Sequence, residues 1–147
     1  MTFQKLGRDS KSMRGYNYQS HKGEAIIYEY FRSIKNKDIN KLIRLFADDA
    51  IIYEPFSKAG DTNGLQGRTA IESFLNIAIM ANSGLNHQIE IIKSDPKVRS
   101  NTDQITANVT FERGEKVKVK FVFEFSPESL NFNKQKKIQS LRIEFIK

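Results

Sequence analysis

The spacing of apolar residues predicts helices in the first half of the chain. Between Glu24 and Phe46 apolar side chains recur every three or four residues, which predicts two amphipathic helices separated by the polar segment 36–38. Asp38 is placed to cap the second of them, which ends at Phe46. Two helices joined this closely form a helical hairpin. A third helix is predicted from Thr69 to Gly84, opened by a capping box of Thr69 and Glu72.

The second half of the chain follows a period of two, which is typical of strands. Apolar and polar residues alternate over 87–91, 105–111, 117–125 and 141–145, and Arg113-Gly114 predicts a hairpin turn. An earlier short strand, 50–54, ends before Pro55. Helices that largely precede the strands predict an α+β domain in which three helices pack on one face of a curved antiparallel sheet. Such a sheet can curl around the helices and leave a pocket.

Composition narrows the class of protein. The chain has 147 residues, of which 39% are apolar, so one folded domain with a real core is expected. Cysteine is absent, which excludes disulfides and thiolate sites and fits a reducing compartment. The first residues contain no apolar signal segment, and no apolar run approaches the ~20 residues of a membrane span. We therefore expect a cytoplasmic protein that does not bind a membrane.

Positive charge is concentrated near the N-terminus. The net charge is +7, and residues 1–22 carry five basic residues against Asp9 alone. We expect residues 1–22 to form a basic, flexible leader and residues 23–147 to form the domain. A leader that contacts nucleic acid is the alternative, but no recognisable binding module surrounds it, so a nucleic-acid partner is not expected.

Glu54 is the leading candidate for a functional carboxylate. It shares a strand face with Ala50 and Ile52 and stands where Pro55 ends the strand, so it could act as a general base at a cavity mouth. The alternative is a structural acid that pairs with a nearby cation. The glycine-rich segment 57–67 is long enough to form a lid.

Tyr30 and His87 are two further candidates for functional residues. Tyr30 could donate a hydrogen bond to a ligand oxygen, or it could simply be a core tyrosine. His87 shares the strand face of Ile89 and Ile91, and a partly buried structural histidine is the favoured interpretation. Two histidines do not make a metal cluster, and the glycines lack the spacing of a phosphate-binding loop. No metal or other cofactor is therefore expected.

The stretch YFRSIKNKDINKLIRLFADDAIIYEPF, followed by GLQGRTAIESFL, resembles the nuclear-transport-factor-2-like superfamily. Within it, the stretch is most similar to the ketosteroid isomerase and polyketide cyclase (SnoaL-like) branch. The resemblance implies a cone, in which a curved sheet wraps around three helices, usually as a homodimer. In the enzymes of this superfamily the interior of the cone is the active site.

The resemblance also implies roles for individual residues. The tyrosine that hydrogen-bonds the substrate oxyanion falls on Tyr30, and the proton-shuttling carboxylate falls on Glu54, where the isomerase has aspartate. The isomerase's second oxyanion donor, a carboxylic acid, falls on Lys118, or on Val117 or Val119 if the register differs. None of these is an acid, so this chain departs from the steroid isomerase pattern.

We therefore expect a pocket that binds a small, largely apolar ligand, with Glu54 and Tyr30 as the catalytic pair for proton transfer. The residues expected to contact the ligand are Phe56, Phe74, His87, Phe121 and Phe145. The alternative is a non-catalytic protein-interaction or dimerisation module of the same fold.

Overall fold

The computed structural model describes residues 18–55, 64–92, 103–126 and 136–146, and every structural statement below concerns them. The helices are α2 (Tyr18–Lys35), α3 (Ile39–Arg44) and α4 (Arg68–Asn82). The strands are β1 (Phe46–Tyr53), β2 (Leu65–Gln66), β3 (His87–Ile92), β4 (Asp103–Arg113), β5 (Glu115–Phe125) and β6 (Ile138–Phe145). The α+β class and the order of the predicted elements are confirmed.

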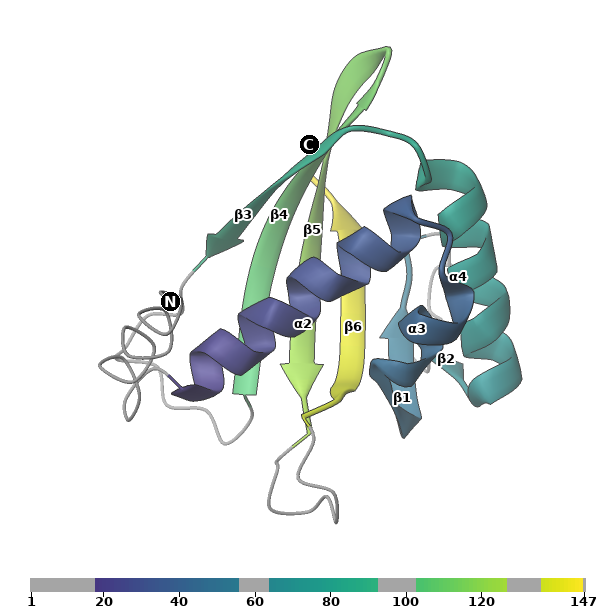
Figure 1. Cartoon of the computed structure of the whole chain (residues 1–147), viewed down its shortest axis with the longest axis vertical. Helices are drawn as coiled ribbons and strands as arrows, with labels where there is room; N and C mark the ends of the chain where they lie inside the picture. The colour runs from purple at the N-terminus through teal and green to yellow at the C-terminus, as the bar shows by residue number, and fades with distance from the viewer. Residues whose placement is uncertain (1–17, 56–63, 93–102, 127–135, 147) are drawn as a thin grey trace, which may run out of the picture.

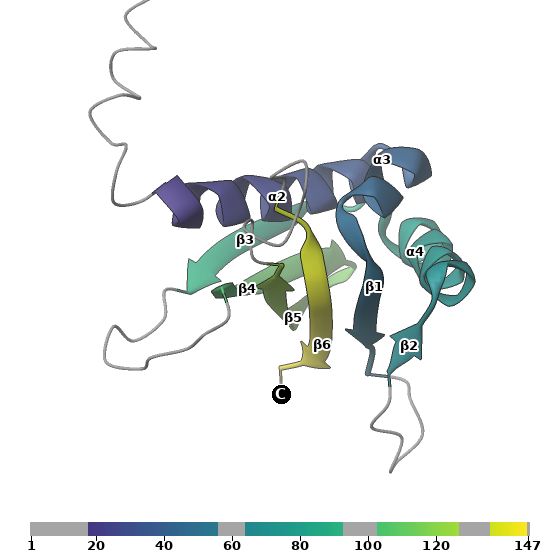
Figure 2. The same ribbon diagram turned by 90° about the horizontal axis from the view of Figure 1, so that it is seen from below.

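The six strands form one curved, unclosed sheet in the order β2-β1-β6-β5-β4-β3. Neighbouring strands are antiparallel except β1 and β6, which run parallel. The prediction was a wholly antiparallel sheet, and this one pair of strands departs from it. Helix α2 lies across one face of the sheet, and α4 stands beside α3 near β1 and β2 (Figure 1). Seen from below, β3 to β6 curve beneath α2 (Figure 2).

The predicted alternation along the long strands is confirmed by burial. On β5, Val119, Phe121, Phe123 and Phe125 are buried, and Lys118 on the opposite face is exposed. The corresponding residues of β4 and β6 complete the core beneath α2. Each fully buried aromatic or aliphatic side chain contributes about 1.5–3 kcal/mol to folding.

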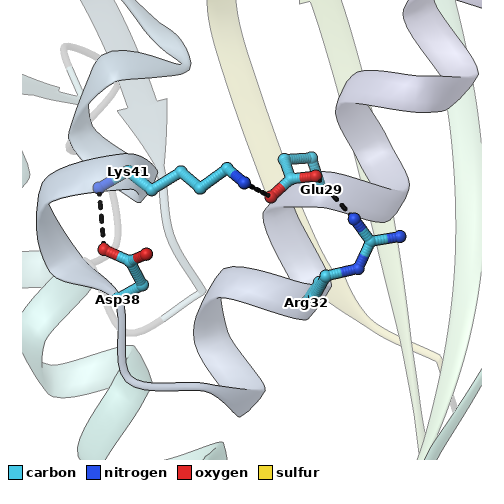
Figure 3. A network of polar contacts seen from close by, with 4 residues as sticks. All are labelled: Glu29, Arg32, Asp38 and Lys41. Atoms are coloured by element: carbon cyan, nitrogen blue, oxygen red, sulfur yellow. Dashed lines mark hydrogen bonds and ion pairs between the residues drawn. The ribbon is translucent and has the colours of Figure 1, made fainter.

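Polar contacts join α2 to α3. Asp38 caps α3 as predicted, because its carboxylate accepts a hydrogen bond from the backbone N–H of Lys41 at 3.1 Å. The ammonium of Lys41 lies 2.7 Å from one oxygen of Glu29, whose other oxygen accepts from Arg32 at 2.8 Å (Figure 3). Arg32 and Lys41 are exposed, and exposed ion pairs contribute only about 0.2–1 kcal/mol each, so these contacts add little to stability.

Three local predictions differ from the structure. Phe46 begins β1 and does not end a helix, because its backbone is aligned with Ile138 of β6. The predicted capping box is wrong: Gly67, with φ of 93°, is the N-cap of α4 and no side chain caps it, because Thr69 already lies within the first turn. Helix α2 begins at Tyr18, earlier than its apolar pattern indicates.

Some predictions lie outside the described residues. These are Phe56, most of the predicted lid 57–67 and most of the basic leader. In the described part of the chain, no helix is both long and apolar enough to cross a membrane.

Candidate functional site

An apolar cavity of about 560 Å³ opens between α2, α4, the β4–β5 hairpin and the ends of β1 and β6. Fifteen of the twenty residues that line it are apolar, and the five others are Tyr30, Glu54, Ser73, Asn82 and Arg113. Small-molecule sites typically have a volume of about 300–1,000 Å³ and few polar groups on a mainly apolar wall. The volume of this cavity and its mainly apolar lining fall within these ranges.

Tyr30 lies in the second half of α2 and lines the cavity. Its ring is buried against Phe31 and Phe123, with ring centroids 4.9 and 5.6 Å away in edge-to-face geometry. Burial raises the pKa of the Tyr30 hydroxyl well above its ordinary value of 10, because the phenolate would be poorly solvated. At neutral pH the hydroxyl therefore remains protonated and can donate a hydrogen bond.

Glu54 follows the last residue of β1 and lies on the same cavity wall. It is half-buried, and the preceding inward residues Ile52 and Ala50 are fully buried, as the predicted strand face requires. Because β1 is aligned with β6 and β6 with β5, Glu54 lies near the level of Phe121 along the sheet. Glu54 and Tyr30 thus line the same apolar cavity.

The structure brings three of the five predicted ligand contacts to this cavity. Phe74 of α4, Phe121 of β5 and Phe145 of β6 line the wall, with Phe121 buried and Phe145 about half exposed. Phe145 is thus a partly exposed part of the cavity lining. Phe56 falls outside the described residues.

His87 is not among the described residues that line the cavity. It is half-buried in β3, with its ring centroid 5.7 Å from that of Phe31 and 6.1 Å from that of Phe111. Burial and the positive charge of Lys35 lower its pKa, and a backbone hydrogen bond with Leu85 opposes them. In this structure His87 packs behind two of the lining aromatic residues.

The positions that match the isomerase's second oxyanion donor are apolar on the cavity side. Val117 and Val119 line the cavity, whereas Lys118 is exposed on the other face of β5. Among the described lining residues, Glu54 is therefore the single acid. Tyr30 matches the first oxyanion donor of the isomerase. No carboxylic acid stands at the positions that match the second donor.

Sequence reasoning missed three polar residues of the wall. Ser73 and Asn82 lie on α4, and Arg113 lies at the end of β4 beside the hairpin turn. Arg113 was interpreted as a turn residue, yet it has the strand parity of the buried Phe111. That parity was the available signal that Arg113 belongs to the inner face.

This arrangement can hold an apolar molecule and offer it three kinds of polar group. Glu54 can accept a proton, the Tyr30 hydroxyl can donate to an oxygen, and Arg113 can bind an anion. The rest of the lining is apolar apart from Ser73 and Asn82, so these five side chains are the polar groups that the described wall offers to a ligand.

No protein-family model and no curated protein matches the chain. Solved structures do match it. OCP1 from Fremyella diplosiphon matches at 20% identity with a TM-score of 0.61 over 82% of this chain, which spans only 34% of that protein. A candidate ketosteroid isomerase from Parabacteroides distasonis matches at 15% identity with a TM-score of 0.60, covering 84% of each chain.

A further match is an NTF2-like protein of unknown function from Pseudomonas putida, at 11% identity and a TM-score of 0.56, covering 85% of this chain and 86% of that one. Identities this low concern the fold and leave the activity open. The element order, the curved six-stranded sheet and these matches together show that the chain has the nuclear-transport-factor-2-like fold.

Proposed function

We propose that this protein binds a small, largely apolar ligand in the cavity and that Glu54 and Tyr30 move a proton on that ligand. The observation that carries the proposal is the position of both residues on the wall of one apolar cavity of about 560 Å³. A cavity that remains open despite its aromatic lining favours ligand binding over a purely structural interaction module.

The proposed chemistry is proton transfer beside a carbonyl group. The Glu54 carboxylate accepts a proton from the carbon next to the carbonyl, and the electron pair of that C–H bond passes into an enolate. The Tyr30 hydroxyl donates a hydrogen bond to the enolate oxygen, which the raised pKa of Tyr30 permits because the hydroxyl stays protonated. Glu54 then returns the proton to carbon, so no cofactor is consumed.

Binding is tested with the neutral fluorescent probe N-phenyl-1-naphthylamine. Ala78 lines the cavity from α4, so Ala78→Phe should fill it and weaken binding by about tenfold or more. Met80 is 81% exposed on the same helix and does not line the cavity, so Met80→Phe should bind as the wild type does. Circular dichroism verifies that each variant is folded, and Val117→Phe replaces Ala78→Phe if that variant is not.

A wild-type protein that fails to bind the probe, or folded cavity-filling variants that bind as well as the wild type, would contradict the binding proposal.

Proton transfer is tested separately by deuterium exchange of 2-decanone in D₂O, followed by NMR. Glu54→Gln should remove the protein's acceleration of exchange at the carbons beside the carbonyl, a loss of about 10²-fold or more. Tyr30→Phe should slow exchange by about 10²-fold, because it removes one oxyanion donor. Glu72→Gln, at an exposed position of α4, is the matched control and should leave the rate unchanged. Binding without exchange would reject the proton transfer and retain the binding.

A further inference from the structure

Arg113 gives the cavity a second polar end. It is the single cation among the described lining residues, and it lies at the exposed tip of the β4–β5 hairpin. Along β5, Glu54 is near the level of Phe121, whereas Arg113 is aligned with Glu115, six residues further on. At ~3.3 Å per strand residue, the two backbone levels are separated by about 20 Å. The acid and the cation therefore mark opposite ends of an apolar space.

The charge of Arg113 is not neutralised by an ion pair within the described structure. The nearest acid by register is Glu115, its partner across the hairpin, but no ion pair within 4.0 Å joins the two. A guanidinium with this freedom can present two N–H groups side by side to a planar carboxylate. Since Arg113 is the single cation among the described lining residues, a ligand that carries one negative charge would match it.

The exposure of Arg113 suits an anionic group better than a buried position would. A carboxylate held at the mouth keeps part of its hydration, so the cost of burying a charge is largely avoided. At the other end the described lining residues offer no second cation, because Arg113 is the single one among them. The position of this single cation therefore favours one orientation of a ligand that is negatively charged at one end only.

We propose that the ligand is an elongated apolar carboxylic acid whose carboxylate binds Arg113 at the mouth while its apolar part extends toward Tyr30 and Glu54. This inference rests on the proposed function, because it names the class of molecule that the same cavity takes. The inference goes beyond the proposed function because it assigns ligand specificity to Arg113, which takes no part in the proposed proton transfer.

The test compares two ligands that differ only in their head group. Dodecanoate and 1-dodecanol are used to displace N-phenyl-1-naphthylamine at pH 7.5, below the concentration at which dodecanoate forms micelles. We expect dodecanoate to bind about fivefold more tightly, the effect of an exposed but well-formed charge pair. Arg113→Gln should remove this preference without weakening the binding of 1-dodecanol, and Arg113→Lys should retain part of it.

Two neighbouring residues provide matched controls. Lys116 lies one residue beyond Glu115 on the exposed face of β5, so Lys116→Gln should leave the preference unchanged. Glu115→Gln removes the negative charge that is nearest to Arg113 by register, so it should reduce repulsion of the ligand carboxylate and increase the preference for dodecanoate. Higher salt should reduce the preference, because the pair is exposed.

The outcomes separate this inference from the proposed function. If 1-dodecanol and the probe bind but dodecanoate binds no more tightly, or if Arg113→Gln keeps the preference, the assignment of Arg113 is wrong and the apolar cavity still stands. If neither ligand displaces a bound probe, or the probe itself does not bind, the proposed function fails and this inference fails with it.

Discussion

The two ends of β5 carry the same alternating pattern but border different environments. At the closed end, Phe123 and Phe125 are almost completely buried beneath α2, and their rings stack with centroids 6.2 Å apart. At the open end, Val117, Val119 and Phe121 face the cavity. The inward face of one strand is thus core over half its length and cavity wall over the other half.

The difference arises from how closely the helices approach the strands. At the closed end Gly23 of α2 faces Ile105 and Phe125, and a Cβ atom at this glycine would lie 2.7 and 3.1 Å from their side chains. The missing side chain lets the helix approach the sheet closely. At the open end the facing residues of α4, such as Ala78 and Ala81, have small side chains that leave the space unfilled. Helix spacing and side-chain size therefore decide where the cavity forms.

The largest effect should come from removing an aromatic ring at the closed end. Phe123→Ala is expected to lower the free energy of unfolding by about 3–5 kcal/mol, because it leaves a closed void in the core. Phe121→Ala should cost about 1–2 kcal/mol less, since it enlarges a space that is already open on one side. Urea denaturation of both variants measures the difference, and equal costs would contradict the distinction between the two ends.

A smaller effect should follow when side-chain volume is added. Gly23→Leu should lower the free energy of unfolding by about 1–3 kcal/mol, because Ile105 and Phe125 must move to admit it. Ala78→Leu adds volume where space is available, so it should change stability by no more than about 0.5 kcal/mol and should weaken probe binding. Thermal unfolding and probe titration on the same samples compare the two. A stable Gly23→Leu variant would show that the closed end has unfilled space.

Periodicity alone was enough to predict most of the fold. The alternation around Phe121 and Phe123 identified the inner face of β5, and Asp38 identified the start of α3, because both depend on neighbours close in sequence. The capping box failed for a tertiary reason. The two-residue strand β2 pairs with Ile51 and Ile52, and the chain then turns at Gly67 with positive φ before α4 begins. That long-range pairing gives no periodic signal.

The candidate site was predictable in part for the same reason. Glu54 and Tyr30 lie on faces that strand and helix parity define, so their common direction could be expected, and the family resemblance supplied their roles. The position of His87 depended on how far the cavity extends beyond Phe31 and Phe111, which parity does not specify. Arg113 was missed because turn chemistry at Gly114 accounted for it without reference to the inner face.

The smallest predicted effect concerns His87, which packs beside the open end without lining it. Burial, followed by the charge of Lys35, lowers its pKa in the folded protein below the value of about 6.5 expected in the unfolded chain. Well above pH 6.5 the His87 imidazole is neutral in both the folded and the unfolded state. His87 therefore adds no pH dependence to the free energy of unfolding in that range. As the pH falls below 6.5 the unfolded chain binds the proton first, and the folded state loses stability.

The replacement His87→Gln cannot titrate and should therefore lose less stability than the wild type between pH 7.5 and 5.5. Urea midpoints at the two pH values measure this, and the difference between the proteins isolates His87 because every other titrating group is common to both. If the two proteins lost equal stability, His87 would have to be as well solvated as in the unfolded chain. It would then have to lie away from Phe31 and Phe111, and the wall behind the cavity would be looser than the ring contacts indicate.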